Sequence, residues 1–301
     1  MRVFVTGSAG FVGQYVCQRF GEQGTGVVGA VRHVRKDGSP FVEHQIAADL
    51  SDDLFAEKVV DSVERCDVIV HLAADITVPE SPNTIGANIY GTRNVTSLAE
   101  KWKVGKLIFL SSIPVIGMPL ELPVTELHPV APRTLYHMSK YVGERIIANS
   151  AVADKSLILR IPSPIGAGMK ATGFIPVILR KFLNNESVEL YGSGERIQNY
   201  LDVRDLAETV CRCASGDRSG LYLLGGSRSY SNRETADICR RAAGSSSEII
   251  TGRKADPEED LKWIISCEKA RAELGFSPKY DLEDSIRWIA EGLKNETPHL
   301  L

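Results

Sequence analysis

Short apolar runs alternate with amphipathic stretches along the first half of the chain. The runs are RVFVTG, GVVGAVR, CDVIVHLAA, GKLIFLSS and SLILRIP, and most of their positions are apolar in succession. The longest amphipathic stretches between them lie at about residues 84–103 and 134–149. Nearly continuous apolar strands that alternate with helices are typical of a parallel sheet covered on both faces. We therefore expect an α/β fold with a doubly wound parallel sheet.

The pattern changes after about residue 164, where loop, helix, strand and turn signals follow in a less regular order. Asp202 has the character of a helix N-cap, and Ser231 with Glu234 forms a Ser-x-x-Glu capping box. Two more helix-like stretches close the chain. We expect a first domain over residues 1–164 and a smaller mixed α+β lobe over residues 165–301, with segments that cross between the two.

Composition and charge narrow the class of protein. Of the 301 residues, 43% are hydrophobic and 24% are charged, and the net charge of −3 gives no reason to expect a nucleic-acid or membrane partner. The six cysteines are scattered without a CxxC pair. We therefore expect them to be reduced thiols, and we expect neither a disulfide framework nor a metal site. No apolar run approaches the roughly 18 residues of a membrane-spanning helix, and the chain opens on a strand rather than a leader peptide. We therefore expect a cytoplasmic protein with a small-molecule substrate and no metal.

The segment TGSAGFVG follows the first strand and opens the first helix. Its glycines, Gly7, Gly10 and Gly13, are spaced as a tight turn, a close backbone approach and close helix packing require. The N–H groups and partial positive charge of the helix N-terminus would then face a pyrophosphate. The alternative is a tight turn with a structural role alone. The strand–turn–helix context favours dinucleotide binding.

From this turn onward the chain resembles the extended short-chain dehydrogenases/reductases, and within them the sugar-nucleotide epimerases of the NAD-dependent epimerase/dehydratase family. The motifs ADL, HLAA, NIYGTRNV, GSGERIQNYLDVRDLA and KARAELGFSP fit in order, almost from end to end. The resemblance implies a Rossmann-type dinucleotide-binding domain. It places the cofactor against Gly7, Gly10, Phe11, Val12, Gly13, Asp49, Leu50, Leu72, Ala73, Ala74, Asn88 and Pro162.

The residue at the end of the second strand bears on the choice of dinucleotide. NAD-dependent relatives usually have an acidic residue there, which accepts hydrogen bonds from the adenosine ribose. Here Arg32 takes that place, with His33, Arg35 and Lys36 close behind. Because an arginine can pair with a 2′-phosphate, the sequence favours NADP over NAD. The alternative is a solvated cluster of cations with no part in binding.

Tyr136 and Lys140 lie four residues apart on one predicted helix, so both side chains project from the same face. The apolar residues Met138, Val142 and Ile146 form a separate stripe, so the pair is expected to lie off the core side of the helix. A nearby ammonium favours the phenolate and lowers the pKa of tyrosine toward neutrality. The pair is therefore expected to transfer protons. In the family, the lysine also binds the nicotinamide ribose, so both residues are counted among the cofactor contacts.

The family pattern adds a serine at the end of the fifth strand. Alignment of Gly117 with the family's closing glycine selects Ser112 as this residue, with Ser111 as the fallback. Ile116 stands where the family usually has a tyrosine, which loosens the register. The alternative to a catalytic centre is a surface Tyr/Lys pair and a strand-end turn without chemistry.

The residues after Ser112 bear on the reaction. Dehydratases of the family typically have an Asp-Glu pair there, which performs the β-elimination. Here Ile113 and Pro114 follow instead. Dehydration is therefore disfavoured, which leaves reversible hydride transfer, as an epimerisation through a keto intermediate or as a net oxidation or reduction.

The substrate is less clearly indicated. Many extended relatives hold a nucleotide diphosphate with an asparagine after the sixth strand and an arginine after the GxG turn. This chain has Ser163 and Gln198 at these positions, with Arg196 two residues earlier, and Leu223 where relatives often have another asparagine. A nucleotide-diphosphate sugar is the first expectation. The alternatives are a smaller carbonyl or alcohol, of dihydroflavonol, steroid or polyketide type, and a non-catalytic dinucleotide sensor, although such sensors commonly lose the tyrosine or lysine.

The resemblance also bears on assembly. Two long helices per subunit often form the dimer interface in the family, and here these are residues 84–103 and 134–149. A homodimer is therefore expected.

Overall fold

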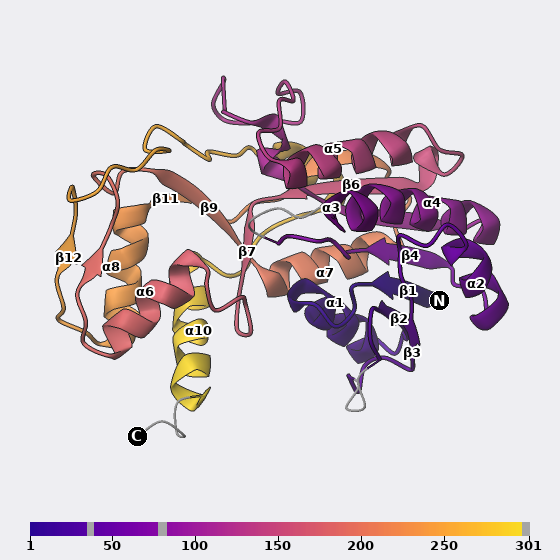
Figure 1. Ribbon diagram of the computed structural model, residues 1–301, viewed down its shortest axis with the longest axis horizontal. Helices are drawn as coiled ribbons and strands as arrows, with labels where there is room; N and C mark the ends of the chain where they lie inside the picture. Colours follow the sequence, from indigo (N-terminus) through magenta and orange to yellow (C-terminus); the bar gives the residue numbers. More distant parts are fainter. Residues whose placement is uncertain (35–38, 78–82, 297–301) are drawn as a thin grey trace.

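The computed structural model describes residues 1–34, 39–77 and 83–296, so Arg35 and Lys36 lie outside the described residues. Within these residues, seven parallel strands form the central sheet, in the order β10–β6–β5–β4–β1–β2–β3 (Figure 1). The strands are β1 (Arg2–Thr6), β2 (Gly26–Val31), β3 (His44–Ala47), β4 (Val68–His71), β5 (Lys106–Ser112), β6 (Ser156–Ile161) and β10 (Gly220–Leu223). The predicted doubly wound sheet is confirmed.

The order of the strands reverses around β1. The chain runs outward from β1 through β2 to β3, and then returns to place β4 on the other side of β1. In open α/β sheets, ligands bind outside the carboxyl ends of the strands at such a switch point. The glycine-rich turn begins where β1 ends, so the topology places this turn at the expected binding edge.

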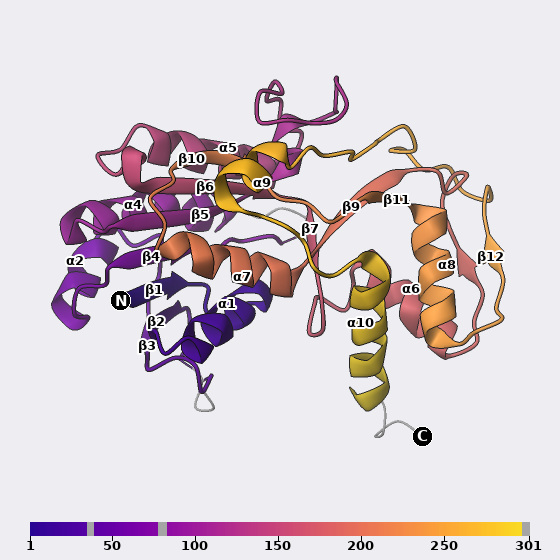
Figure 2. The ribbon, with the colours of Figure 1, turned by 180° about the vertical axis from the view of Figure 1, so that it is seen from behind.

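Helices cover both faces of the sheet because successive strand residues point to opposite sides. On one face, Val3 and Val5 pack with α1 (Phe11–Glu22) and α7 (Val203–Ala214), which lie side by side in Figure 2. On the other face, Phe4 packs into a second core with the remaining helices around this sheet. These are α2 (Phe55–Ser62), α4 (Gly91–Trp102) and α5 (Leu135–Ala148). Short 3₁₀ turns lie at Ile113–Ile116 and Ala153–Lys155.

The predicted helix over residues 84–103 is interrupted. A short turn, α3 (Asn83–Ile85), passes into a π-helical stretch, η1 (Gly86–Tyr90), before α4 begins. Such π-helical turns are rare, and those that occur are frequently at functional sites. The stretch contains Asn88, whose side chain hydrogen-bonds Ser139 of α5, as described below.

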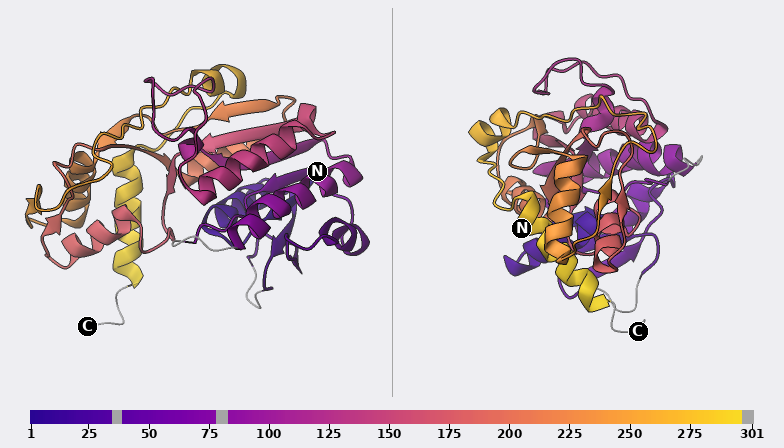
Figure 3. Two further views of the ribbon diagram at one scale, coloured as in Figure 1. Left: turned by 45° about the horizontal axis from the view of Figure 1, so that its top comes forward. Right: turned by 90° about the vertical axis from the view of Figure 1, so that its left-hand side faces the viewer.

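The smaller lobe lies to one side of the main sheet (Figure 3). It contains the sheet β11–β9–β7, the strand pair β12–β8 and a core of its own. Its elements are β7 (Ser163–Ile165), α6 (Phe174–Leu183), β8 (Val188–Glu189), β9 (Ile197–Asp202), β11 (Ser229–Ser231), α8 (Asn232–Ala243), β12 (Ile249–Ile250) and α10 (Leu282–Glu296). The chain returns to the main sheet in α7 and β10, and again in α9 (Glu268–Leu274), which packs beside β10, as the expected crossing of segments allows. The division at residue 164 itself stays a prediction.

The caps predicted from sequence are present. Asp202 accepts a hydrogen bond from the Arg204 backbone N–H at the start of α7. Ser231 and Glu234 form the reciprocal capping box of α8. Among the described residues, none of the helices combines the length and apolar character needed to span a membrane.

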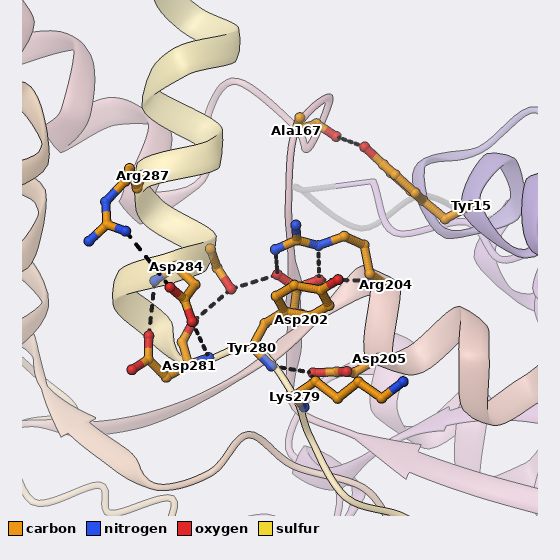
Figure 4. A network of polar contacts seen from close by, with 11 residues as sticks. Tyr15, Ala167, Asp202, Arg204, Asp205, Lys279, Tyr280, Asp281, Asp284 and Arg287 are labelled. Atoms are coloured by element: carbon orange, nitrogen blue, oxygen red, sulfur yellow. Dashed lines mark hydrogen bonds and ion pairs between the residues drawn. The ribbon is translucent and has the colours of Figure 1, made fainter.

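Aromatic and charged side chains connect the lobe to the half of the protein that contains the main sheet, and Figure 4 shows Tyr15, Asp202, Arg204 and Tyr280 among them. The Arg204 guanidinium lies 3.5 Å from the ring centre of Tyr280 and 4.0 Å from that of Trp288. Asp202 accepts two hydrogen bonds from the same guanidinium, at 2.9 and 2.8 Å. Tyr15 of α1 packs edge-on against Trp288. The lobe is thereby held in place at the carboxyl edge of the sheet.

Candidate active site

The glycine-rich turn has a geometry that side chains would obstruct. Gly7 has φ +70°, and a Cβ there would lie 2.9 Å from the Ala73 backbone. A Cβ on Gly13 would lie 2.1 Å from the Gly7 carbonyl oxygen. The helix begins at Phe11 with Gly10 as its N-cap, and no side chain caps it. Its first backbone N–H groups are therefore available to a phosphate, as a dinucleotide would require.

The loop after β4 lies against this turn. The Leu72 backbone N–H donates to the Thr6 carbonyl at 3.3 Å, and the Ala73 N–H donates to the Thr6 hydroxyl at 3.3 Å. The structure thus brings Leu72 and Ala73, which the sequence assigned to the cofactor, beside Gly7. The glycine-rich turn fits a dinucleotide because its backbone and that of the loop after β4 lie close together, without side chains between them.

His71, at the end of β4, joins the end of β1 to α4, just after the π-helical stretch. Its Nδ1 lies 2.7 Å from the Thr6 hydroxyl and its Nε2 lies 3.1 Å from the Thr92 hydroxyl. Since Thr92 uses its proton to bond the Asn88 carbonyl at 2.6 Å, the proton of the imidazole belongs on Nε2. Burial, and then the neighbouring Lys140, lower the pKa of His71 to about 3. The ring is therefore neutral at physiological pH.

Asn88 carries the chain of hydrogen bonds into α5. Its side-chain oxygen accepts from the Asp75 N–H at 2.7 Å, and its nitrogen donates to the Ser139 hydroxyl at 2.9 Å. Ser139 in turn donates to the Tyr136 carbonyl at 2.7 Å. His71 and Ser139 were not among the residues predicted from the sequence, and the structure places both in this hydrogen-bond network. The available signal was a histidine that ends an otherwise apolar strand.

Lys140 is buried at 4% exposure. Its ammonium donates to the Leu110 carbonyl at 2.8 Å and lies 4.8 Å from the Phe109 ring centre and 6.0 Å from the Tyr136 ring centre. Burial lowers the pKa of Lys140 to about 8, while the nearby Glu144 carboxylate acts in the opposite direction. At neutral pH the lysine remains mostly protonated.

The expected lowering of the tyrosine pKa is not found. Burial raises the pKa of Tyr136 to about 12, because loss of water disfavours the phenolate. The hydroxyl is therefore protonated at neutral pH. This state suits the donation of a proton to a substrate oxygen.

The face of α5 that points inward also differs from the prediction. Met138 and Val142 are 46% and 37% exposed, whereas Lys140 is buried. The inward face carries Ser139, Lys140, Gly143, Glu144 and Ile147. The prediction that the Tyr/Lys pair lies off the core side of the helix was wrong, because polar partners on β5 and β6 accept the buried lysine and glutamate.

The buried ion pair between Glu144 and Arg160 indicates different roles for Ser111 and Ser112. Ser111 donates to the Glu144 carboxylate at 2.5 Å, and Arg160 donates to both oxygens of that carboxylate at 2.8 and 2.7 Å. Both charged side chains are at most 6% exposed. Ser111 is therefore committed to structure. Ser112, partly exposed at the end of β5, stays the predicted catalytic serine.

Arg32 and Asp49 lie near one another beyond β2 and β3, and both are exposed. The Asp49 carboxylate accepts from the Ser51 N–H at 2.9 Å and hydroxyl at 2.7 Å. These bonds, with a smaller contribution from Arg32, hold the pKa of Asp49 below its usual value. The exposed guanidinium of Arg32 therefore has an acidic neighbour.

The predicted substrate residues lie in different surroundings. Ser163 is exposed in β7, whereas Leu223 is buried in the core of β10. Arg196 makes ion pairs with Glu258, at 2.5 Å, and with Asp256, at 3.7 Å. In the amide orientation that satisfies both groups, the carbonyl oxygen of Gln198 accepts from Arg196 Nε at 2.8 Å. Arg196 is thus neutralised by partners from its own chain.

A doubly wound sheet with a glycine-rich turn at its switch point defines a dinucleotide-binding protein of the Rossmann type. Residues 3–225 match the model of the NAD dependent epimerase/dehydratase family, and the chain belongs to this family. The predicted family is thereby confirmed.

Similar proteins carry several related names. A putative UDP-glucose 4-epimerase of Methanocaldococcus jannaschii is 29% identical, over 97% of this chain and 98% of the relative. A dTDP-glucose 4,6-dehydratase of Streptomyces niveus is 25% identical, over 95% and 90%. The UDP-glucose 4-epimerase of Thermotoga maritima, solved with UDP-glucose, has a TM-score of 0.87 at 22% identity, covering 98% of this chain and 99% of that one. WbmG of Bordetella bronchiseptica, solved with NAD and UDP, has a TM-score of 0.87 at 23% identity, covering 98% and 96%.

Proposed function

We propose that the protein is an NAD(P)-dependent epimerase or oxidoreductase of nucleotide-diphosphate sugars, with Tyr136, Lys140 and Ser112 as its catalytic centre. The observation that carries the proposal is the burial of Lys140 beside Tyr136, on a helix that hydrogen bonds connect to the loop packed against the glycine-rich turn. A buried ammonium without a function would be expensive to maintain.

Each residue has a role that follows from its chemistry. The protonated Tyr136 donates its proton to a carbonyl oxygen of the substrate and recovers it in the reverse direction. Lys140 stays charged next to it and stabilises the phenolate that donation leaves behind. Ser112 hydrogen-bonds the same substrate oxygen. The nicotinamide cofactor, when bound, supplies or accepts the hydride.

The substrate class rests on the relatives, whose names include UDP-glucose and dTDP-glucose. Thermal-shift measurements with UDP- and dTDP-sugars, in the presence of cofactor, test it. A ligand at 100 times its Kd stabilises by about 2.7 kcal/mol, which raises Tm by roughly 5 °C for a chain of this size. An unchanged Tm with every nucleotide sugar would exclude this class.

One observation favours a second candidate, the oxidation or reduction of a smaller carbonyl or alcohol. Arg196, near the position expected for a diphosphate contact, already has carboxylate partners. Stabilisation by apolar ketones or alcohols, without stabilisation by nucleotide sugars, would select it. A dinucleotide sensor is the third reading. Unchanged turnover in Tyr136→Phe would contradict the catalytic proposals.

Two finer points are part of the proposal. Ile113 is buried and hydrophobic where dehydratases of the family have an acid, so we propose that the reaction stops short of elimination, although some relatives are named dehydratases. Arg32 supports the binding of NADP, but the names of similar structures mention NAD, and Asp49 offsets the charge of Arg32. Separate titrations with NADH and NADPH decide which of the two dinucleotides binds more tightly.

The assembly is proposed from the outward face of α5. Met138 and Val142 on this helix, and Ile85 and Tyr90 on the neighbouring helical segment, are large hydrophobic side chains at 37–48% exposure. A face of this kind is suited to a second copy. We propose a homodimer through these helices, in a cytoplasmic protein. A monomeric mass in sedimentation at micromolar concentration would contradict it.

A further inference from the structure

Two arginines and two carboxylates form a charge cluster between the catalytic helix and the smaller lobe. Glu258 lies at its centre, 2.5 Å from Arg196 and 3.7 Å from Arg133. Arg133 precedes Tyr136 by three residues, and Arg196 precedes β9 by one. Asp256 is the second carboxylate, 3.7 Å from Arg196. The four side chains therefore bring two positive and two negative charges together where the segment before α5 meets the smaller lobe.

The loop that carries the carboxylates is fastened to the GSGE turn. The Gly192 N–H donates to the Lys254 carbonyl, and the Gly252 N–H donates to the Gly192 carbonyl, both at 2.7 Å. The Ser193 N–H donates to the Glu259 carboxylate at 2.6 Å. These hydrogen bonds hold the backbone of the loop against the GSGE turn. The groups of this loop that contact Arg196 are therefore side chains.

The carboxylates of Asp256 and Glu258 differ in how easily each can move away from Arg196. The side chain of Asp256 is 8% exposed and accepts a hydrogen bond from the Glu258 N–H at 2.9 Å. The side chain of Glu258 is 36% exposed, and Arg133 is 53% exposed. Glu258 can thus rotate into solvent without breaking the frame of the loop, whereas Asp256 remains and orients Arg196.

We propose that Glu258 holds the place of the substrate's diphosphate in the free protein and must swing away when the substrate binds. This inference rests on the proposed nucleotide-sugar substrate. With Glu258 in place the cluster is neutral, and its exposed carboxylate repels an anion. Once Glu258 leaves, the cluster carries a net charge of +1, and two guanidinium groups can make bidentate contacts with the diphosphate. Glu258 therefore sets the affinity for the diphosphate.

Titration calorimetry with UDP as the probe, at saturating NADH, tests this on the full chain. Glu258→Gln removes the competing charge and is expected to tighten UDP binding on the order of tenfold, since the two partly exposed ion pairs no longer compete with the diphosphate. Glu259→Gln is the matched control. It makes the same charge change one residue away, where the carboxylate contacts Ser193 rather than an arginine. It should bind UDP as the wild type does.

A double variant, Arg133→Gln with Glu258→Gln, should lose much of the gain, because one of the released guanidinium groups is missing. Equal affinity in Glu258→Gln and wild type would overturn the inference while leaving the proposed function intact. Equal tightening by both glutamine variants would also overturn it, because the effect would then belong to the loop's general charge. Absence of UDP binding in all variants, with NADH binding retained, would overturn the proposed substrate and this inference together.

Discussion

Replacement of Glu144 by glutamine should destabilise the protein and alter the titration of Lys140. The carboxylate balances Arg160 in a buried ion pair and also accepts from Ser111. Loss of one partner of such a pair leaves the other charge uncompensated, at a cost of about 3–5 kcal/mol. At roughly 2 °C per kcal/mol for a chain of this size, Tm should fall by about 6–10 °C.

The same substitution should move the alkaline limb of activity. Burial sets the pKa of Lys140 at about 8, and Glu144 is the group that opposes a further decrease. If the protonated lysine is required, kcat/KM of the wild type falls as pH rises through about 8. In Glu144→Gln the limb should move to lower pH, because the nearest carboxylate is gone and the Arg160 charge is uncovered.

Scanning calorimetry and pH–rate profiles measure the two effects separately. The matched control replaces both Glu144 and Arg160 by methionine, which removes the ion pair without leaving a lone charge. This variant should regain most of the lost stability, as buried pairs often contribute little net stability over hydrophobic residues. An unchanged Tm in Glu144→Gln would refute the assigned ion pair, and an unchanged alkaline limb would refute the coupling to Lys140.

Three further substitutions test other parts of the site. Tyr136→Phe should lower kcat by about 10²–10⁴ with little change in NADH affinity, as for loss of a general acid, and stopped-flow turnover with binding titration checks it. Gly13→Ala should abolish dinucleotide binding, because its Cβ would lie 2.1 Å from the Gly7 oxygen, whereas Gly105→Ala, with its nearest contact at 3.6 Å, should not. His71→Gln should flatten the acid side of the stability curve: the folded pKa of about 3 lies below the unfolded value near 6.5, so the wild type loses stability as pH falls from about 6.5 toward 3. Denaturant titrations that show the same acid dependence in both proteins would contradict this last expectation.

The strands and the phosphate turn could be predicted because each depends on local sequence. Apolar runs of strand length and glycines that tolerate no Cβ report their structure without reference to distant residues. The helix caps at Asp202 and Ser231 are predictable for the same reason. Their side chains bond backbone groups only two or three residues away.

The inward face of α5 could not be predicted from its own periodicity. Met138 and Val142 form the apolar stripe, yet Lys140 and Glu144 are the buried residues. Their burial depends on Leu110 and on residues of β5 and β6 that neutralise or bond them, and these lie 16 to 33 positions away in the chain. Hydrophobic periodicity describes a single element, whereas partners for buried charge come from the tertiary structure. The raised pKa of Tyr136 has the same origin.

The arrangement of charges offers a reason why the half of the protein that carries Tyr136 and the smaller lobe would be coupled. Arg133 lies just before the helix that carries Tyr136, and Arg196 lies in the turn that leads into the lobe. Glu258 bridges the two arginines across this boundary. A diphosphate that takes the place of Glu258 would connect the same two elements through its own oxygens. Binding of the substrate would then restore the bridge that it displaced, and keep the lobe and the catalytic helix in register during hydride transfer.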